Sequence, residues 1–128
     1  MNEKISGNLI IIGGAEDKRG KKEILKKVAE YINTKEDKML IATEYPEKTY
    51  DDYKNIFIKL GIKNIDKLDI SKREDAFNDK NINLIKTTNL LFFTGGDQLR
   101  ITSMIGGTPI YNVIKELCSN GGVIAGTS

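Results

Sequence analysis

Short apolar runs alternate with amphipathic stretches along the chain. Three runs, Asn8-Leu-Ile-Ile-Ile12, Met39-Leu-Ile-Ala42 and Asn89-Leu-Leu-Phe-Phe-Thr94, are apolar at successive positions. Such runs are typical of strands that are buried on both faces of a parallel sheet. Two further strands are predicted at residues 65–70, where the apolar period is imperfect, and at residues 122–125. The pattern therefore predicts five strands.

The stretches between these runs predict helices. One apolar stripe recurs at helical spacing from about Lys21 to Asn33, and a second stripe further along stops at Gly61. Thr108 and Pro109 have the residue types of a helix N-cap and first helical position, and Asn120-Gly121 has those of a helix end. Three helices are predicted from these signals.

A further helix start is predicted after the third strand. Ser71-Lys-Arg-Glu74 has the spacing of a capping box, in which the Ser and Glu side chains satisfy free N–H groups, and a second helical stretch follows around Asp79 to Thr87. Strands alternating with helices predict a doubly wound, mainly parallel α/β sheet with right-handed crossovers and helices on both faces. Residues 1–128 are expected to form a single α/β domain.

The composition agrees with one folded domain and says little about partners. Of the 128 residues, 39% are hydrophobic, which is enough for a single core. Lys and Arg number 20 and Asp and Glu 18, and the basic residues lie mainly at predicted helix positions such as Lys21, Lys22, Lys26 and Lys27. A solvated helix face explains them, so no nucleic-acid partner is expected.

The chain carries no sign of an oxidising compartment or a membrane. Its single cysteine, Cys118, excludes an internal disulfide and is expected to be a small core residue. There is no 18-residue apolar run, and the first residues lack the order of a signal peptide. A cytoplasmic location without membrane contact is therefore expected, and the sequence predicts no cofactor and no metal site.

Histidine is absent from the 128 residues. A Ser–His or Cys–His catalytic pair therefore cannot be assembled from this sequence alone. An enzyme of that kind needs more chain.

The turns after the predicted strands are the places to look for a ligand site, because ligands bind beyond the carboxyl ends of strands in such sheets. The first turn, Gly13-Gly-Ala-Glu-Asp17, is neither GxGxxG nor a P-loop. Its glycines allow close backbone approach, and its carboxylates could face a ligand. Alternatively, the glycines form only the turn, and Glu16 or Asp17 caps the next helix.

The second turn, Thr94-Gly-Gly-Asp-Gln98, follows a buried strand. Glycines at positions 95 and 96 leave backbone N–H groups open to stabilise an oxyanion, and Gln98 can exchange hydrogen bonds with a substrate amide. Ordinary turn chemistry would also account for the two glycines. The whole sequence of the turn favours a functional role.

The third turn is Gly126-Thr-Ser128, the front half of the GxSxG nucleophile elbow. In that motif a strand ends, the chain turns sharply, and small neighbours let the serine hydroxyl project above the sheet. Three residues alone are common in loops. Their place after a strand, on the same rim as the Gly95-Gly96 turn, favours Ser128 as a nucleophile.

Three segments resemble one enzyme family. The segments Ile11–Lys18, Phe92–Ile101 and Val123–Ser128, in this order, are similar to those of the serine peptidase family that contains cyanophycinase and aspartyl dipeptidase. The resemblance spans nearly the whole chain, and the middle segment is the most specific. It implies a fold similar to class I glutamine amidotransferases and hydrolysis of arginine-bearing poly-aspartate to β-aspartyl-arginine dipeptides.

The resemblance also assigns roles to residues. Ser128 corresponds to the catalytic nucleophile, Gly95 and Gly96 form the oxyanion site, and Asp97 and Gln98 contact the substrate, a peptide or cyanophycin-type polymer. The histidine and acidic partner of Ser128 are expected later in a longer catalytic domain, of which this chain is the N-terminal part. The isolated chain is therefore expected to be inactive.

Two other interpretations remain open. In the first, the chain is a flavodoxin-like module whose glycine turns bind a small molecule or anion without reaction. In the second, it is one piece of an assembly, such as a homodimer, because an exposed sheet edge favours pairing with another chain.

Overall fold

The computed structural model describes residues 8–12, 25–26, 28–30, 36–43, 47–93 and 103–127. Residues 25–26 and 28–30 are helical, and residues 103–105 form one helical turn. The longer elements are the strands β1 (Asn8–Ile12), β2 (Lys38–Thr43), β3 (Asn64–Asp69), β4 (Leu90–Phe93) and β5 (Val123–Thr127), the helices α2 (Glu47–Lys59), α3 (Asp79–Lys86) and α5 (Pro109–Ser119), and the 3-10 helix η1 (Arg73–Phe77).

The described strands form one sheet in the order β1-β5-β4-β2-β3, and all neighbours are parallel. The five predicted strands are therefore confirmed, including the one with the imperfect period. That strand, β3, lies at an edge of the sheet. Its exposed residues include the charged Asp66 and Asp69. Charged side chains are a common protection of edge strands against pairing with other chains.

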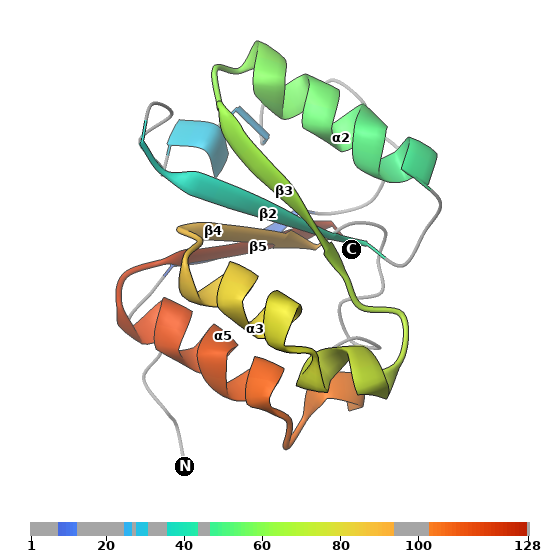
Figure 1. Ribbon diagram of the computed structural model, residues 1–128. Coiled ribbons are helices and arrows are strands. Elements are labelled where there is room, and N and C mark those ends of the chain that lie inside the picture. Colours follow the sequence, from blue (N-terminus) through green and yellow to red (C-terminus); the bar gives the residue numbers. More distant parts are fainter. Residues whose placement is uncertain are drawn as a thin grey trace.

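Two apolar layers cover the sheet, one on each face. Along β4, Leu90 and Phe92 pack with α2 and with the helical residues Leu25, Val28 and Ala29, whereas Leu91 and Phe93 pack with α3 and α5. The alternation follows from the strand period of two residues, and it makes every position of β4 buried. Figure 1 shows α2 on one side of the sheet and α3 and α5 on the other. The predicted doubly wound α/β fold is confirmed.

The order of the strands fixes how the chain crosses the sheet. From β1 to β2 and then to β3 the chain moves toward the β3 edge, and the connecting helical residues pack on one face. From β3 to β4 and then to β5 it moves back, with α3 and α5 on the other face. When the chain reverses its direction of travel across the sheet, the connecting helices also change to the other face. The four crossovers therefore all have the same hand, consistent with the right-handed rule for parallel strands.

The predicted helix ends are also confirmed where the structure describes them. The Thr108 side chain accepts a hydrogen bond from the Tyr111 N–H at 3.3 Å, and Pro109 opens α5. At the other end, the N–H of Gly122 donates to the Leu117 carbonyl and that of Gly121, at φ +87°, to the Cys118 carbonyl. This pair of bonds is a Schellman motif. Gly61, at φ 99°, ends α2 with the same pair of bonds.

The capping box is the local prediction that needs correction. A helical element does begin after Ser71, but it is the 3-10 helix η1, and the acidic cap is Asp75 instead of Glu74. The Asp75 carboxylate accepts the Ser71 N–H at 2.9 Å and the Lys72 N–H at 3.2 Å. Glu74 is exposed and forms an ion pair with the Lys72 ammonium, at 3.6 Å. The helix begins one residue later than predicted, with Lys72 as its N-cap, so its third residue is Asp75 and not Glu74.

Several smaller predictions can be compared with the described residues. Cys118 is buried in the α3–α5 layer, and Lys26 is exposed, as expected. Most of the remaining predicted 21–33 helix lies outside the described residues. Within the described part of the chain, no helix combines the length and apolarity needed to cross a membrane.

Candidate functional site

Three neighbouring strands end in step at one edge of the sheet. In the register of β1 with β5, Ile12 lies opposite Thr127, and in that of β4 with β5, Phe93 lies opposite Gly126. Because the three strands are parallel, their carboxyl ends lie together. The candidate turns Gly13–Asp17 and Thr94–Gln98 follow β1 and β4 in sequence, and the third candidate turn, Gly126–Ser128, overlaps the end of β5.

The candidate side chains themselves lie outside the described residues. This holds for Ser128, for Gly95, Gly96, Asp97 and Gln98, and for the Gly13–Asp17 turn. What the structure establishes is the arrangement of the strands that lead into them.

The end of β5, which leads to Ser128, differs from the prediction. β5 continues through Gly126 to Thr127, two residues beyond the predicted end at Ala125. The extension follows from pairing, because β1 runs alongside β5 as far as Thr127. Ser128 directly follows Thr127 in the sequence, and in an elbow the nucleophile lies where the chain turns at the end of a strand.

The two neighbours of β5 lead to opposite faces of the sheet. After β1 the next described residues, 25–26 and 28–30, are helical and lie on the α2 face, whereas α5, which follows β4, lies on the other face. In doubly wound sheets this divergence opens a crevice beyond the carboxyl ends of the strands, where ligands bind. β5 ends between the two diverging connections.

The segment 94–102 is bounded by described structure on both sides. Before it, Phe93 is buried in the α3–α5 layer. After it, residues 103–108 form a compact corner in which Ile105 and Thr108 are buried and the Ile105 carbonyl accepts hydrogen bonds from the Thr108 N–H and hydroxyl. Gly107 adopts φ +77° in this corner, a conformation that favours glycine.

A hollow of about 230 Å³ lies at the opposite edge of the sheet. Asn89 and Gly122, which directly precede β4 and β5, line it together with the ends of α3 and α5. Because it adjoins the amino ends of the strands, this hollow is separate from the candidate site.

The shifted pKa values among the described residues have structural causes. Burial raises the pKa of the Cys118 thiol, and burial followed by nearby aspartates raises that of Tyr50. Hydrogen bonds from Ser71 are the main reason that the pKa of Asp75 is lowered. Within the described residues, His, Cys, Asp and Glu side chains form no group of three that could hold a metal ion.

Comparison with known proteins agrees with this arrangement. The chain is 30% identical to the cyanophycinase of Geminocystis herdmanii (strain PCC 6308) and 31% identical to that of Trichormus variabilis (strain ATCC 29413 / PCC 7937). All of this chain aligns with 48% of the first, and 94% of it with 42% of the second. The chain therefore spans about half the length of these relatives.

The fold is found in a solved structure as well. The crystal structure of a peptidase from an acI-B1 Actinobacterium superposes with a TM-score of 0.72 at 26% sequence identity, over 95% of this chain and 54% of the other. The family model for peptidase family S51 matches residues 9–128, which include all three candidate turns from Gly13 onward. This chain belongs to peptidase family S51, a family of serine peptidases.

Proposed function

We propose that this chain is the N-terminal part of the catalytic domain of a cyanophycinase-like serine exopeptidase. The observation that carries the proposal is the shared edge at which β1, β5 and β4 end, with Ser128 directly after the central one of the three. The substrate class, arginine-bearing poly-aspartate cleaved to β-aspartyl-arginine dipeptides, is supported by the similarity to cyanophycinases.

In this proposal Ser128 is the nucleophile and residues 94–98 bind the reacting amide. The Ser128 Oγ attacks the amide carbonyl carbon, and a general base takes the hydroxyl proton. The N–H groups of Gly95 and Gly96 stabilise the oxyanion, while Asp97 and Gln98 contact the substrate. The proton passes to the departing amine as the C–N bond breaks, and water then hydrolyses the acyl-enzyme.

An imidazole general base has to come from outside the 128 residues, because the chain contains no histidine. The relatives are about twice as long as this chain, which leaves room for a histidine and an acidic partner in the remaining half. A Ser hydroxyl without such a base is a weak nucleophile.

The test uses the full-length protein that contains this chain, incubated with cyanophycin while release of β-aspartyl-arginine is measured. Ser128→Ala is expected to lower turnover by on the order of 10⁶-fold, as loss of a serine nucleophile does elsewhere. Ser119→Ala is the matched control, because Ser119 is an exposed serine at the end of α5, next to the opposite edge of the sheet.

Two outcomes would contradict the proposal. One is turnover of cyanophycin that survives Ser128→Ala. The other is the absence of hydrolysis together with binding of phosphate or aspartate that Ser128→Ala leaves unchanged, which would favour a binding module without catalysis.

A further inference from the structure

The Arg73 side chain joins two parts of the molecule that are distant in sequence. Its Nη1 donates hydrogen bonds to the carbonyl oxygens of Met104, at 2.8 Å, and Gly106, at 3.1 Å. These carbonyls belong to the corner 103–108, which directly follows the segment 94–102. A single guanidinium nitrogen therefore holds two peptide groups of the corner.

The corner 103–108 is also held by contacts that do not involve Arg73. Ile105 anchors the corner in the α3–α5 layer, and Thr108 satisfies the Ile105 carbonyl. The Met104 and Gly106 carbonyls on either side accept from Arg73. Three successive carbonyls are thus satisfied, two of them by one side chain, and charged donors make stronger bonds than neutral ones.

The 3-10 helix that carries Arg73 is itself firmly fixed. The buried Asn81 amide of α3 donates to the Asp69 carbonyl at the end of β3, at 3.1 Å, and to the Asp75 carbonyl in η1, at 3.0 Å. Asp75 in turn accepts the N–H groups of Ser71 and Lys72. Arg73 therefore extends from a backbone that is tied to both the sheet and α3.

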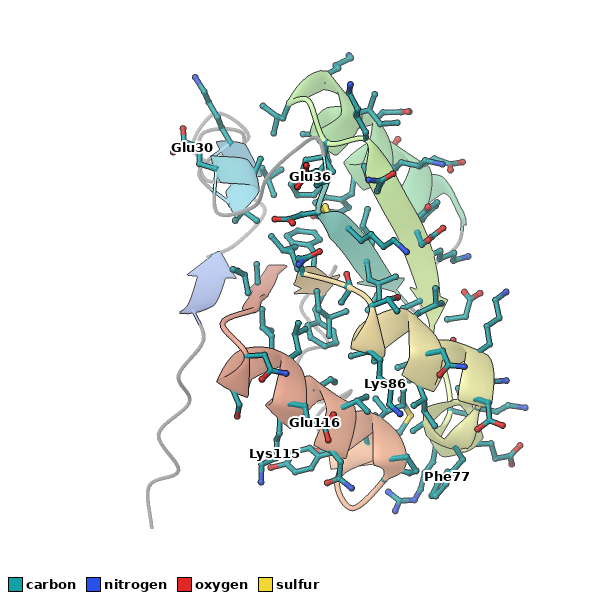
Figure 2. All side chains as sticks on the ribbon, turned by 60° about the vertical axis from the view of Figure 1, so that its left-hand side comes forward. Glu30, Glu36, Phe77, Lys86, Lys115 and Glu116 are labelled. Atoms are coloured by element: carbon teal, nitrogen blue, oxygen red, sulfur yellow. The ribbon has the colours of Figure 1, made fainter. Side chains whose placement is uncertain are left out.

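The Phe77 ring, which lies beside the Arg73 guanidinium, further restricts the orientation of the Arg73 side chain. The guanidinium carbon lies 5.9 Å from the centre of the Phe77 ring, within the range of a cation–π contact. Phe77 is half exposed and projects from the outer end of η1, away from the sheet (Figure 2). The ring and the two carbonyls together restrict the rotamers open to the Arg73 side chain.

We propose that Arg73 is a positioning residue. By holding the corner 103–108, it fixes the point at which the segment 94–102 rejoins the described fold. The Arg73 contact itself stands on the described geometry, while its effect on turnover rests on the proposed function, in which Gly95 and Gly96 bind the oxyanion. Small displacements of groups that act on the transition state lower kcat strongly. Arg73 acts through the corner and need not touch substrate.

The first measurement is amide hydrogen exchange of peptides covering residues 103–108, which does not depend on activity. Arg73→Met keeps an unbranched, flexible stem and removes the guanidinium with all of its donors. Exchange in the corner is expected to become about tenfold faster, while peptides from β4 and β5 stay unchanged. Lys72→Met is the matched control, because the exposed Lys72 ammonium forms its ion pair with Glu74, at 3.6 Å, and not with the corner.

The second measurement is the steady-state kinetics of the full-length protein. Arg73→Met is expected to lower kcat about tenfold or more, with KM nearly unchanged, because an oxyanion contact acts mainly in the transition state. Arg73→Lys restores a cation without the planar fork and should give intermediate exchange and kcat. If Arg73→Met fails to fold, Arg73→Lys alone decides the comparison.

Unchanged exchange at residues 103–108 would overturn the inference, as would faster exchange with an unaltered kcat in an active enzyme. If the wild-type protein hydrolyses no peptide, the proposed function is wrong, yet the exchange result still decides whether Arg73 holds the corner.

Discussion

At the scale of single residues, side-chain contacts to backbone groups fix the short connections of the fold. Asn81 is buried, and its side-chain amide donates to the carbonyls of Asp69 and Asp75, the second of which also accepts the Asn78 N–H. The Thr88 hydroxyl lies between the Lys38 and Leu90 carbonyls, at 3.0 and 3.1 Å, where β2 and β4 begin. Such contacts contribute more by avoiding unsatisfied polar groups than by their own strength.

Asp75 gives a prediction about pH. Its pKa is lowered from the ordinary value of 3.8, chiefly by hydrogen bonds from Ser71, so the folded state favours the carboxylate. The stabilisation is therefore complete above pH 3.8 and is lost as the pH falls through the lower, folded-state pKa. Asp75→Asn should reduce the free energy of unfolding by about 1 kcal/mol or less at pH 7, because water screens this partly exposed group.

Urea denaturation of both proteins at pH 7 and near pH 3 measures this difference. The two curves should approach each other at the lower pH. A difference that stays constant or grows on acidification would show that the Asp75 charge does not stabilise η1.

At the scale of secondary structure, the end of α5 shows two different requirements for glycine. Gly121 adopts φ +87°, but a Cβ there would meet nothing within 4 Å. Gly122 needs space instead: a Cβ would lie 2.8 Å from the Leu117 carbonyl oxygen and would overlap the Leu117 side chain. One glycine is required by backbone conformation and the other by close packing.

This difference predicts unequal costs for two similar substitutions. Gly121→Ala should lower the free energy of unfolding by about 1 kcal/mol, the usual strain of alanine in the left-handed region. Gly122→Ala should cost more, about 2–3 kcal/mol, because the Leu117 backbone cannot move without breaking the Schellman bonds. Thermal or urea denaturation checks the order, and equal costs would contradict the packing argument.

At the scale of the whole molecule, the sheet brings together turns that are far apart in sequence. β5 lies between β1 and β4, so the segments after residues 12, 93 and 127 start from three adjacent strands. The helical residues that follow β1 pack on one face of the sheet, and α5, which follows β4, packs on the other face. A reaction centre at this edge would therefore depend on the entire sheet rather than on one loop.

The isolated chain of 128 residues is predicted to show no measurable peptidase activity. It lacks a histidine, so Ser128 has no imidazole base, and peptide bonds are not cleaved at useful rates by an unassisted serine hydroxyl. The measurement is release of β-aspartyl-arginine from cyanophycin, compared with the full-length protein. Serine-dependent turnover by a preparation whose intact mass shows only this chain would contradict the prediction.

The sequence by itself determined the kinds of element and many of their ends. Periods of two and of 3.6 residues identify strands and helices, and the glycines after α2 and α5 mark helix ends because their conformations are set by neighbours in the chain. The apolar runs at β1, β2 and β4 also predicted a sheet covered on both faces. These features depend on contacts within a few residues.

Only the tertiary structure decided the order of the strands and the partners of the polar side chains. No local pattern places β5 between β1 and β4, extends it to Thr127, or joins Arg73 to carbonyls 31 and 33 residues away. The choice of Asp75 over Glu74 as the cap likewise depended on where η1 begins, because Lys72 and not Ser71 is its N-cap. Pairing and capping of this kind are selected by the packing of distant segments, which no short stretch of sequence contains.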